Sequence, residues 1–235
     1  MLTTFAHLQS LSASSPFWGG KDTGYASNRA LMFQQLPTAG LPFQFGTWEA
    51  REGYGADMLH PGVIDAFDEV RWDLRPAPQF GTLETRICDG VTNVSELLAL
   101  AALTHCLVEH FSTMLDEGRE LPSIPPWYAQ ENKWRSARYG MDAIIILDRE
   151  GNEELVTDAV GRLLVELEPV AARLGCLDEL DGVRTIVRRG ASYQRQRAVA
   201  RRHGGELAAV VRSLVAERRA GRPRGPGGAG TRGGR

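Results

Sequence analysis

The sequence predicts an α+β protein, because its expected strands and helices do not alternate as they would in a doubly wound sheet. Strand signals fall in two regions, residues 70–88 and 143–147, whereas helical periodicity dominates the last third of the chain. The 235 residues, 43% of them apolar, suffice for a continuous hydrophobic core and exclude wholesale disorder.

Three segments have the pattern of β-strands. Residues 70–75 and 82–88 alternate apolar with polar side chains, as half-buried strands do. Pro76-Ala77-Pro78 is expected to be a stiff connection between these two strands. Residues 143–147 form a short apolar run, typical of a buried strand, and the turn residues 148–152 end it.

Six helices are expected from residue 93 onward. Asn93 has a glutamate three residues later, which is the spacing of a helix cap, and the apolar run continues to Leu115 before Gly118. Pro169 should kink or split one helix, because proline removes a backbone donor. The other five helices are predicted over 127–139, 157–174, 178–188, 192–202 and 205–219.

Charge is concentrated at the C-terminal end. Residues 201–235 hold nine arginines against two glutamates, although the whole chain is nearly neutral. Residues 221–235 are nearly all Gly, Arg and Pro, a composition that cannot bury a core. We therefore predict one domain over 1–220 and a disordered tail over 221–235. Such a tail can contact nucleic-acid phosphates, but it lacks aromatic residues for base stacking, and a solvated tail is the simpler interpretation.

The sequence also predicts a cytoplasmic protein without a membrane partner. The three cysteines are an odd, sparse set that fits a reducing compartment. The longest uninterrupted apolar stretch, 97–103, is far shorter than the roughly 20 residues that span a bilayer. A secretory signal begins with a positively charged region, but the first 20 residues contain no Lys or Arg.

Glu84 and Arg86 are the central candidates for chemistry. Residues two apart in a strand share a face, with Cα atoms roughly 7 Å apart, so the two side chains should lie together, opposite Leu83, Thr85 and Ile87. A carboxylate can hold Mg²⁺, and a guanidinium can bind a phosphate or a carboxylate. From the spacing alone, an exposed sheet face with a local ion pair is the simpler interpretation.

Three other regions carry weaker signals. Residues 10–16 and 22–29 are rich in small hydroxyl side chains and include a glycine. This composition is typical of a ligand-binding loop, but also of an ordinary capped loop. Cys106 and His110 are four apart on a predicted helix and could share a metal, although a half-buried helix face is the simpler interpretation. Four arginines form a predicted basic patch that could bind a carboxylate or a phosphate: Arg188, Arg189, Arg195 and Arg197. A solvated helix face is the simpler interpretation.

Five motifs follow one another along the chain. They are LSASSPFW at 11–18, DTGYASNR at 22–29, WDLRP at 72–76, TLETRICD at 82–89 and ENKWRSARYG at 131–140. In this order they resemble the carboxylate–amine ligase family, also called glutamate–cysteine ligase type 2. The resemblance covers roughly residues 5 to 218.

The resemblance implies an ATP-dependent ligase that joins a carboxylate to an amine. The typical reaction is γ-glutamyl transfer to cysteine through an acyl phosphate, with ATP and Mg²⁺ as the cofactors and a related acid or amine as possible substrates. The implied fold is similar to that of glutamine synthetase: a curved, mostly antiparallel sheet with ATP and metal on its concave face and helices outside.

The resemblance also assigns roles to individual residues. Glu84 is implied as a Mg²⁺ ligand. Arg86 is implied as the catalytic residue, in contact with the transferred phosphate or the substrate carboxylate. The implied substrate-binding residues are Asp22, Tyr25, Arg29, Arg75 and Arg138.

The chain departs from the family at its beginning. The family's clustered glutamates on a first strand and its later His-x-His segment are missing, so we interpret the chain as the C-terminal part of such a ligase. Because phosphoryl transfer depends on metal ions that neutralise charge, we expect at most weak ATP binding and no turnover from this chain alone. The alternative is a non-catalytic remnant or subunit with a binding or regulatory role. A separate N-terminal half or a second copy would be its partner.

Overall fold

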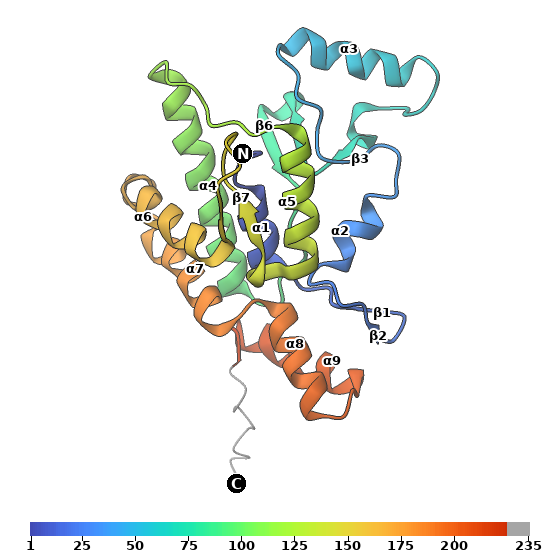
Figure 1. Ribbon diagram of the computed structural model, residues 1–235, viewed down its shortest axis with the longest axis vertical. Helices are drawn as coiled ribbons and strands as arrows, with labels where there is room; N and C mark the ends of the chain where they lie inside the picture. The colour runs from blue at the N-terminus through green and yellow to red at the C-terminus, as the bar shows by residue number, and fades with distance from the viewer. Residues whose placement is uncertain (225–235) are drawn as a thin grey trace.

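Six helices form the second half of the described chain, where the sequence predicts them. The computed structural model describes residues 1–224. The bounds of these helices are α4 (Val94–Asp116), α5 (Pro126–Tyr139), α6 (Val156–Leu174), α7 (Leu177–Arg189), α8 (Ser192–Arg202) and α9 (Leu207–Ala220). In Figure 1, α4, α5, α6 and α7 lie around the shorter helix α1 (Phe5–Ser12), whereas α8 and α9 lie at the lower end of the molecule.

Local signals explain where these helices begin and end. The Asn93 side chain accepts a hydrogen bond from the backbone N–H of Glu96 and so caps α4, as predicted. Gly175 ends α6 at φ 69°, a left-handed conformation that glycine adopts without strain. Of the two expected effects of Pro169, the split does not occur, because α6 continues through this residue, and the kink stays a prediction.

Three helices in the first quarter of the chain were not expected. They are α1 (Phe5–Ser12), α2 (Asn28–Phe33) and α3 (Trp48–Leu59). All eight residues of α1 are buried, including its serines. The interpretation of residues 10–16 as a loop is therefore wrong for the part that α1 contains.

The strands pair two by two. In residues 1–224 there are four two-stranded sheets, one of them parallel, and no larger sheet. They are β1 (Phe17–Trp18) with β2 (Lys21–Asp22), β3 (Ala39–Gly40) with β4 (Arg71–Trp72), β5 (Leu74–Ala77) with β6 (Thr82–Thr85), and β7 (Ile144–Ile146) with β8 (Glu153–Leu155). The predicted α+β class is confirmed, whereas the curved, glutamine-synthetase-like sheet stays a prediction.

The β5–β6 hairpin differs from the expectation in three details. The predicted strand over 70–75 divides at Asp73, since β4 pairs with β3 and β5 pairs with β6. The second predicted strand ends at Thr85 rather than at residue 88. Pro76 lies within β5, which a two-stranded ribbon allows because one side of each strand has no partner.

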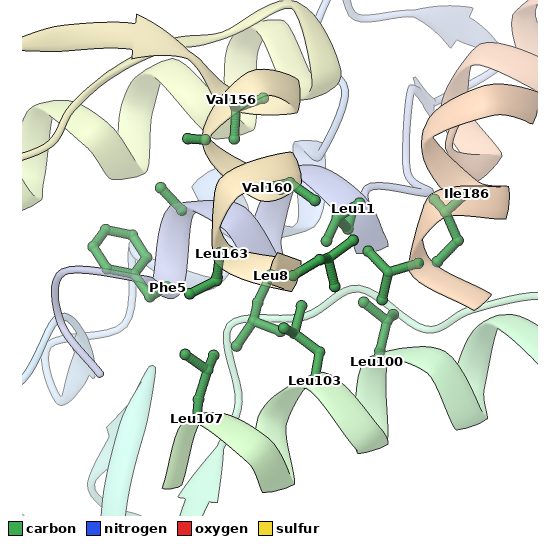
Figure 2. Close-up of a cluster of buried hydrophobic side chains, with 14 of the residues drawn as sticks. Phe5, Leu8, Leu11, Leu100, Leu103, Leu107, Val156, Val160, Leu163 and Ile186 are labelled. Carbon is green, nitrogen blue, oxygen red and sulfur yellow. The ribbon is translucent and has the colours of Figure 1, made fainter. Parts of the chain in front are cut away.

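The main core lies where α1, α4, α6 and α7 meet. Figure 2 shows Leu8 and Leu11 of α1 pointing toward leucines of α4 and toward Val160 of α6. Leu8, Leu103 and several neighbours have 2% of their surface exposed or less. Burying a leucine contributes about 1.5 to 3 kcal/mol, so this cluster fixes α1 as the central element.

A second, smaller core holds the segment that contains α3. Ile64, Val70 and Trp72 are buried there, and Tyr54 and Phe67 pack around them. In Figure 1 this segment lies at the end of the molecule opposite α8 and α9. The Trp72 indole ring is surrounded by aromatic rings, with the Tyr54 centroid 4.9 Å away.

Helix α4 is, by length and composition, the one helix of the described residues that could cross a membrane. Its inward face places Ala99, Leu103 and Leu107 in the core, as in the core helix of a globular protein. Its outward face exposes Leu97 and Leu115.

The first four residues of the predicted tail lie against the domain. The carbonyl of Gly221 accepts a hydrogen bond from the backbone N–H of Ser95, and Pro223 is buried. Residues 221–224 therefore pack against the domain. The rest of the predicted tail, 225–235, lies outside the described residues.

Candidate active site

The β5–β6 hairpin brings three predicted site residues together. Its register pairs Arg75 with Glu84. Arg75 donates from Nε and Nη2 to Oε2 of Glu84, at 2.9 and 2.6 Å. Arg86 donates from Nη1 to the other carboxylate oxygen, at 2.6 Å. The predicted proximity of Glu84 and Arg86 is confirmed, and both oxygens of Glu84 accept hydrogen bonds from guanidinium groups.

Glu84 is held in its ionised form. Partial burial would raise its pKa, but the hydrogen bonds and charges of Arg86 and Arg75 outweigh this effect and lower the pKa below its ordinary value. Arg75 also donates from Nη1 to the carbonyls of Asp68 and Val70. Its donors are thus used within the protein, so Arg75 orients Glu84 rather than offering a free fork.

Arg29 and Arg86 approach each other beside the ring of Phe33. Arg29 donates from Nη2 to the carbonyl of Arg86 at 3.2 Å. The two guanidinium carbons lie 5.3 and 5.9 Å from the Phe33 centroid. Nε of Arg86 is buried and has no hydrogen-bond partner in residues 1–224. A pocket of about 330 Å³, lined by Phe17, Trp18 and Phe33, opens beside Arg29.

Asp89 organises the hydroxyl-rich loop, a role that the sequence did not reveal. Its carboxylate accepts hydrogen bonds from the backbone N–H of Ser14 and from the hydroxyls of Ser15 and Ser27, at 2.7 to 2.9 Å. Asp89 is 5% exposed. Ser27 also caps α2. The serines therefore serve the structure of the loop, as the simpler of the two interpretations predicts.

A second group of predicted residues gathers between this loop, α5 and α8. Arg197 donates from Nε and Nη2 to the two carboxylate oxygens of Asp22, at 2.8 and 2.7 Å, and from Nη2 to the carbonyl of Tyr25. Burial would raise the pKa of Asp22, but the bonds from Arg197 and from the N–H of Gly24 lower it. Asp22 is thus an ionised carboxylate.

Arg138 lies beside Asp22 without a hydrogen-bond acceptor among residues 1–224. Its guanidinium carbon is 5.0 Å from the Tyr25 centroid and 5.8 Å from that of Tyr139. Gly24 lies against it at φ +77°, and a Cβ added there would be 2.6 Å from Nη1 of Arg138. Two rings and a glycine therefore hold a half-buried guanidinium whose donors are unused.

Lys133 and Asp73 form a buried ion pair that the sequence also did not reveal. Nζ of Lys133 donates to Oδ2 of Asp73 at 2.5 Å, and their side chains are 3% and 7% exposed. The backbone carbonyl of Asp73 accepts from the N–H of Arg86. The pair thus connects α5 to the segment that positions Arg86.

The weaker predictions separate into different contacts. Sγ of Cys106 lies 3.7 Å from Sγ of Cys176, whereas Nε2 of His110 lies 3.3 Å from Glu166. Among the described residues no group of three or more His, Cys, Asp or Glu side chains could hold a metal. The predicted patch of four arginines is wrong as one surface, because Arg195 bonds buried glutamates and Arg197 bonds Asp22.

Comparison with known proteins gives the family. The model of glutamate–cysteine ligase family 2 matches residues 1–213. The chain is 63% identical over 221 residues to the "Putative glutamate--cysteine ligase 2-1" of Arthrobacter sp. (strain FB24), an alignment that covers 94% of this chain and 58% of the relative. It is 62% identical over 217 residues to "Putative glutamate--cysteine ligase 2" of Mycobacterium ulcerans (strain Agy99), covering 92% of this chain and 55% of the relative. The chain thus spans little more than half the length of these relatives, and it belongs to glutamate–cysteine ligase family 2.

Proposed function

We propose that this chain carries the amino-acid-binding part of an ATP-dependent carboxylate–amine ligase that forms a γ-glutamyl amide. Its family and the printed names of its relatives support a ligase of the glutamate–cysteine type. The structural observation that supports the proposal is Arg138, a half-buried guanidinium without an acceptor in the described residues.

The surroundings of Arg138 match the charges of an amino acid. A carboxylate accepts two parallel hydrogen bonds from a guanidinium fork, and such pairs are among the stronger hydrogen bonds in proteins. Asp22 is ionised, and its side chain is 42% exposed although Arg197 bonds it. We assign the α-carboxylate of glutamate to Arg138 and its ammonium group to Asp22, because each would meet the opposite charge there.

Arg29 and Arg86 provide positive charge for the reacting end. In the proposed reaction, an oxygen of the γ-carboxylate attacks the terminal phosphorus of ATP, and ADP leaves. The amine then attacks the acyl carbon, phosphate leaves, and the amine loses a proton. Negative charge develops on phosphoryl oxygens, and a preorganised guanidinium stabilises such charge. The guanidinium group of Arg86, whose side chain is 24% exposed, is suited to this role.

The predicted Mg²⁺ ligand does not make a metal site by itself. Glu84 is the one predicted ligand, both its oxygens accept guanidinium hydrogen bonds, and the described residues contain no metal-binding cluster. Glu84 as a Mg²⁺ ligand stays a prediction, and no step of the proposed reaction depends on it. The glutamine-synthetase-like fold and the cytoplasmic location belong to the same proposal.

Binding of L-glutamate to the 235-residue chain tests the amino-acid site. Isothermal titration calorimetry should detect binding, and Arg138→Ala should weaken it at least tenfold. Arg173→Ala removes the same charge from an exposed position of α6 and should leave the affinity within twofold. If Arg138→Ala binds glutamate as tightly as the wild type, the assignment is wrong.

A non-catalytic role is the second candidate. It is favoured by the isolation of Glu84, because residues 1–224 contain no cluster of carboxylates that could hold a metal ion together with it. The two candidates differ in turnover once the chain is joined to the N-terminal part that its longer relatives have. A catalytic chain then releases ADP when ATP, glutamate and cysteine are added, whereas a binding subunit retains glutamate affinity and releases none. Glutamate binding without ADP release would establish the second candidate.

A further inference from the structure

A second cleft lies on the far side of α8 from Asp22. It has a volume of about 1140 Å³ and is formed mainly by the end of α7, by α8 and by α9. In Figure 1, α8 and α9 lie at the lower end of the molecule. Arg197 of α8 points to Asp22, whereas Arg202 of the same helix lines the cleft. None of the residues to which the family resemblance assigns a role lines it, whereas Arg188, Arg189 and Arg195 of the predicted basic patch do.

The lining combines apolar side chains with guanidinium groups. Val187, Ala198, Val199 and Ala209 contribute the apolar part. The exposed arginines that the three helices contribute to the lining are Arg188, Arg189, Arg202 and Arg212.

Few acceptors compensate these charges. Arg188 donates to the hydroxyl of Thr185, and Arg212 donates to Glu206. Within residues 1–224, Arg189 and Arg202 have no hydrogen-bond acceptor or ion-pair partner.

The acids of the cleft do not change this balance. The two acidic residues that line it are Asp142 and Glu217. Both oxygens of Glu217 accept hydrogen bonds from Arg195, and Thr92 donates to one of them. Arg195 also donates from Nη1 and Nη2 to the two carboxylate oxygens of Glu96. Arg195 is therefore neutralised by two glutamates, and the cleft keeps an excess of positive charge.

We propose that this cleft binds a small molecule that carries a polyphosphate group. Guanidinium forks bind phosphate oxygens bidentately, and a chain of phosphates offers enough charge to engage arginines of several helices at once. The volume corresponds to a ligand of about nucleotide size. The apolar lining provides space for the organic part of such a molecule. The proposal is independent of the ligase assignment, because it uses none of the residues of that site.

Inorganic triphosphate is the probe that tests the charged part of the cleft. Isothermal titration calorimetry at low ionic strength should show saturable binding of triphosphate to the 235-residue chain. The double variant Arg189→Ala/Arg202→Ala should weaken this binding at least tenfold. The matched control is Arg201→Ala/Arg218→Ala, which removes two exposed charges from α8 and α9 at positions that do not line the cleft. It should change the affinity less than twofold.

The comparison of the two double variants decides the proposal. Thermal unfolding of both variants should match the wild type, since all four side chains are exposed. Equal weakening in both would mean unspecific attraction to the basic surface, and unchanged binding by Arg189→Ala/Arg202→Ala would place triphosphate elsewhere. Absence of binding to the wild type would also overturn the proposal.

Discussion

Replacing Lys133 with methionine should destabilise the protein strongly. Methionine has nearly the length of lysine but carries no charge, so Asp73 would keep a carboxylate that is 7% exposed and has lost its 2.5 Å partner. Removing one member of a buried ion pair typically costs about 3 to 5 kcal/mol, because the remaining charge is left without compensation. For a domain whose total stability is about 5 to 15 kcal/mol, this is a large fraction.

Urea denaturation followed by circular dichroism measures this cost. The unfolding free energy of Lys133→Met should fall by about 3 to 5 kcal/mol, and the melting temperature by about 6 to 20 °C, at 2 to 4 °C per kcal/mol for a chain of this size. The exposed pair Arg119–Glu117, with side chains 51% and 55% exposed, provides the control. Arg119→Met should cost less than about 1 kcal/mol.

A double-mutant cycle separates the charge interaction from packing. Asp73→Asn alone should also be costly, because it leaves a buried ammonium group. The double variant Lys133→Met/Asp73→Asn removes both charges and should cost less than the sum of the single variants by at least about 1 kcal/mol. Additive effects, or a Lys133→Met cost no larger than that of Arg119→Met, would refute the reasoning.

Three further outcomes follow from single buried groups. Thr85→Val should raise the unfolding free energy, measured by urea denaturation, by about 1 kcal/mol, because Oγ1 of Thr85 is buried without a hydrogen-bond partner in residues 1–224. A decrease of the unfolding free energy by that amount would show that Oγ1 has a partner. Burial lowers the pKa of His7 from 6.5 to about 4. The unfolding free energy should therefore decrease by up to about 3 kcal/mol as the pH falls from 6.5 to about 4. The unfolding free energy of His7→Gln, measured over the same pH range, should lack this decrease. Burial raises the pKa of Cys88 to about 11 and, together with Cys176, that of Cys106 to about 12. Iodoacetamide near pH 8 should therefore alkylate these two thiols far more slowly in the native protein than in urea, as mass spectrometry can measure, and equal rates would contradict their burial.

The helices that could be predicted carry their signals locally. Asn93 begins α4 and Gly175 ends α6, and both effects arise from residues within one turn of the helix end. Helix α1 lacks the usual division into a buried apolar face and an exposed polar face, because all its residues are buried, and its serines are typical of loops. Strands of two residues, such as β3, depend on a distant partner rather than on their own side chains.

The candidate site shows the same division. Glu84 and Arg86 are two residues apart, so the period of a strand was enough to predict that they meet. Asp73 and Lys133 are separated by 60 positions, and only the packing of α5 on the hairpin segment brings them together. Asp89 stands in a motif that the sequence identifies, but its serine partners are 62 to 75 positions away.

The distance along the chain between Asp89 and its partners has a consequence for folding kinetics. The entropy of closing so long a segment must be lost before the hydrogen bonds to Asp89 can form. We therefore expect the segment that Asp89 organises, which includes Asp22, Tyr25 and Arg29, to become ordered late in folding. Contacts that form after the transition state slow unfolding and leave the folding rate nearly unchanged. The lifetime of the ordered loop, more than the speed of its formation, depends on this one carboxylate.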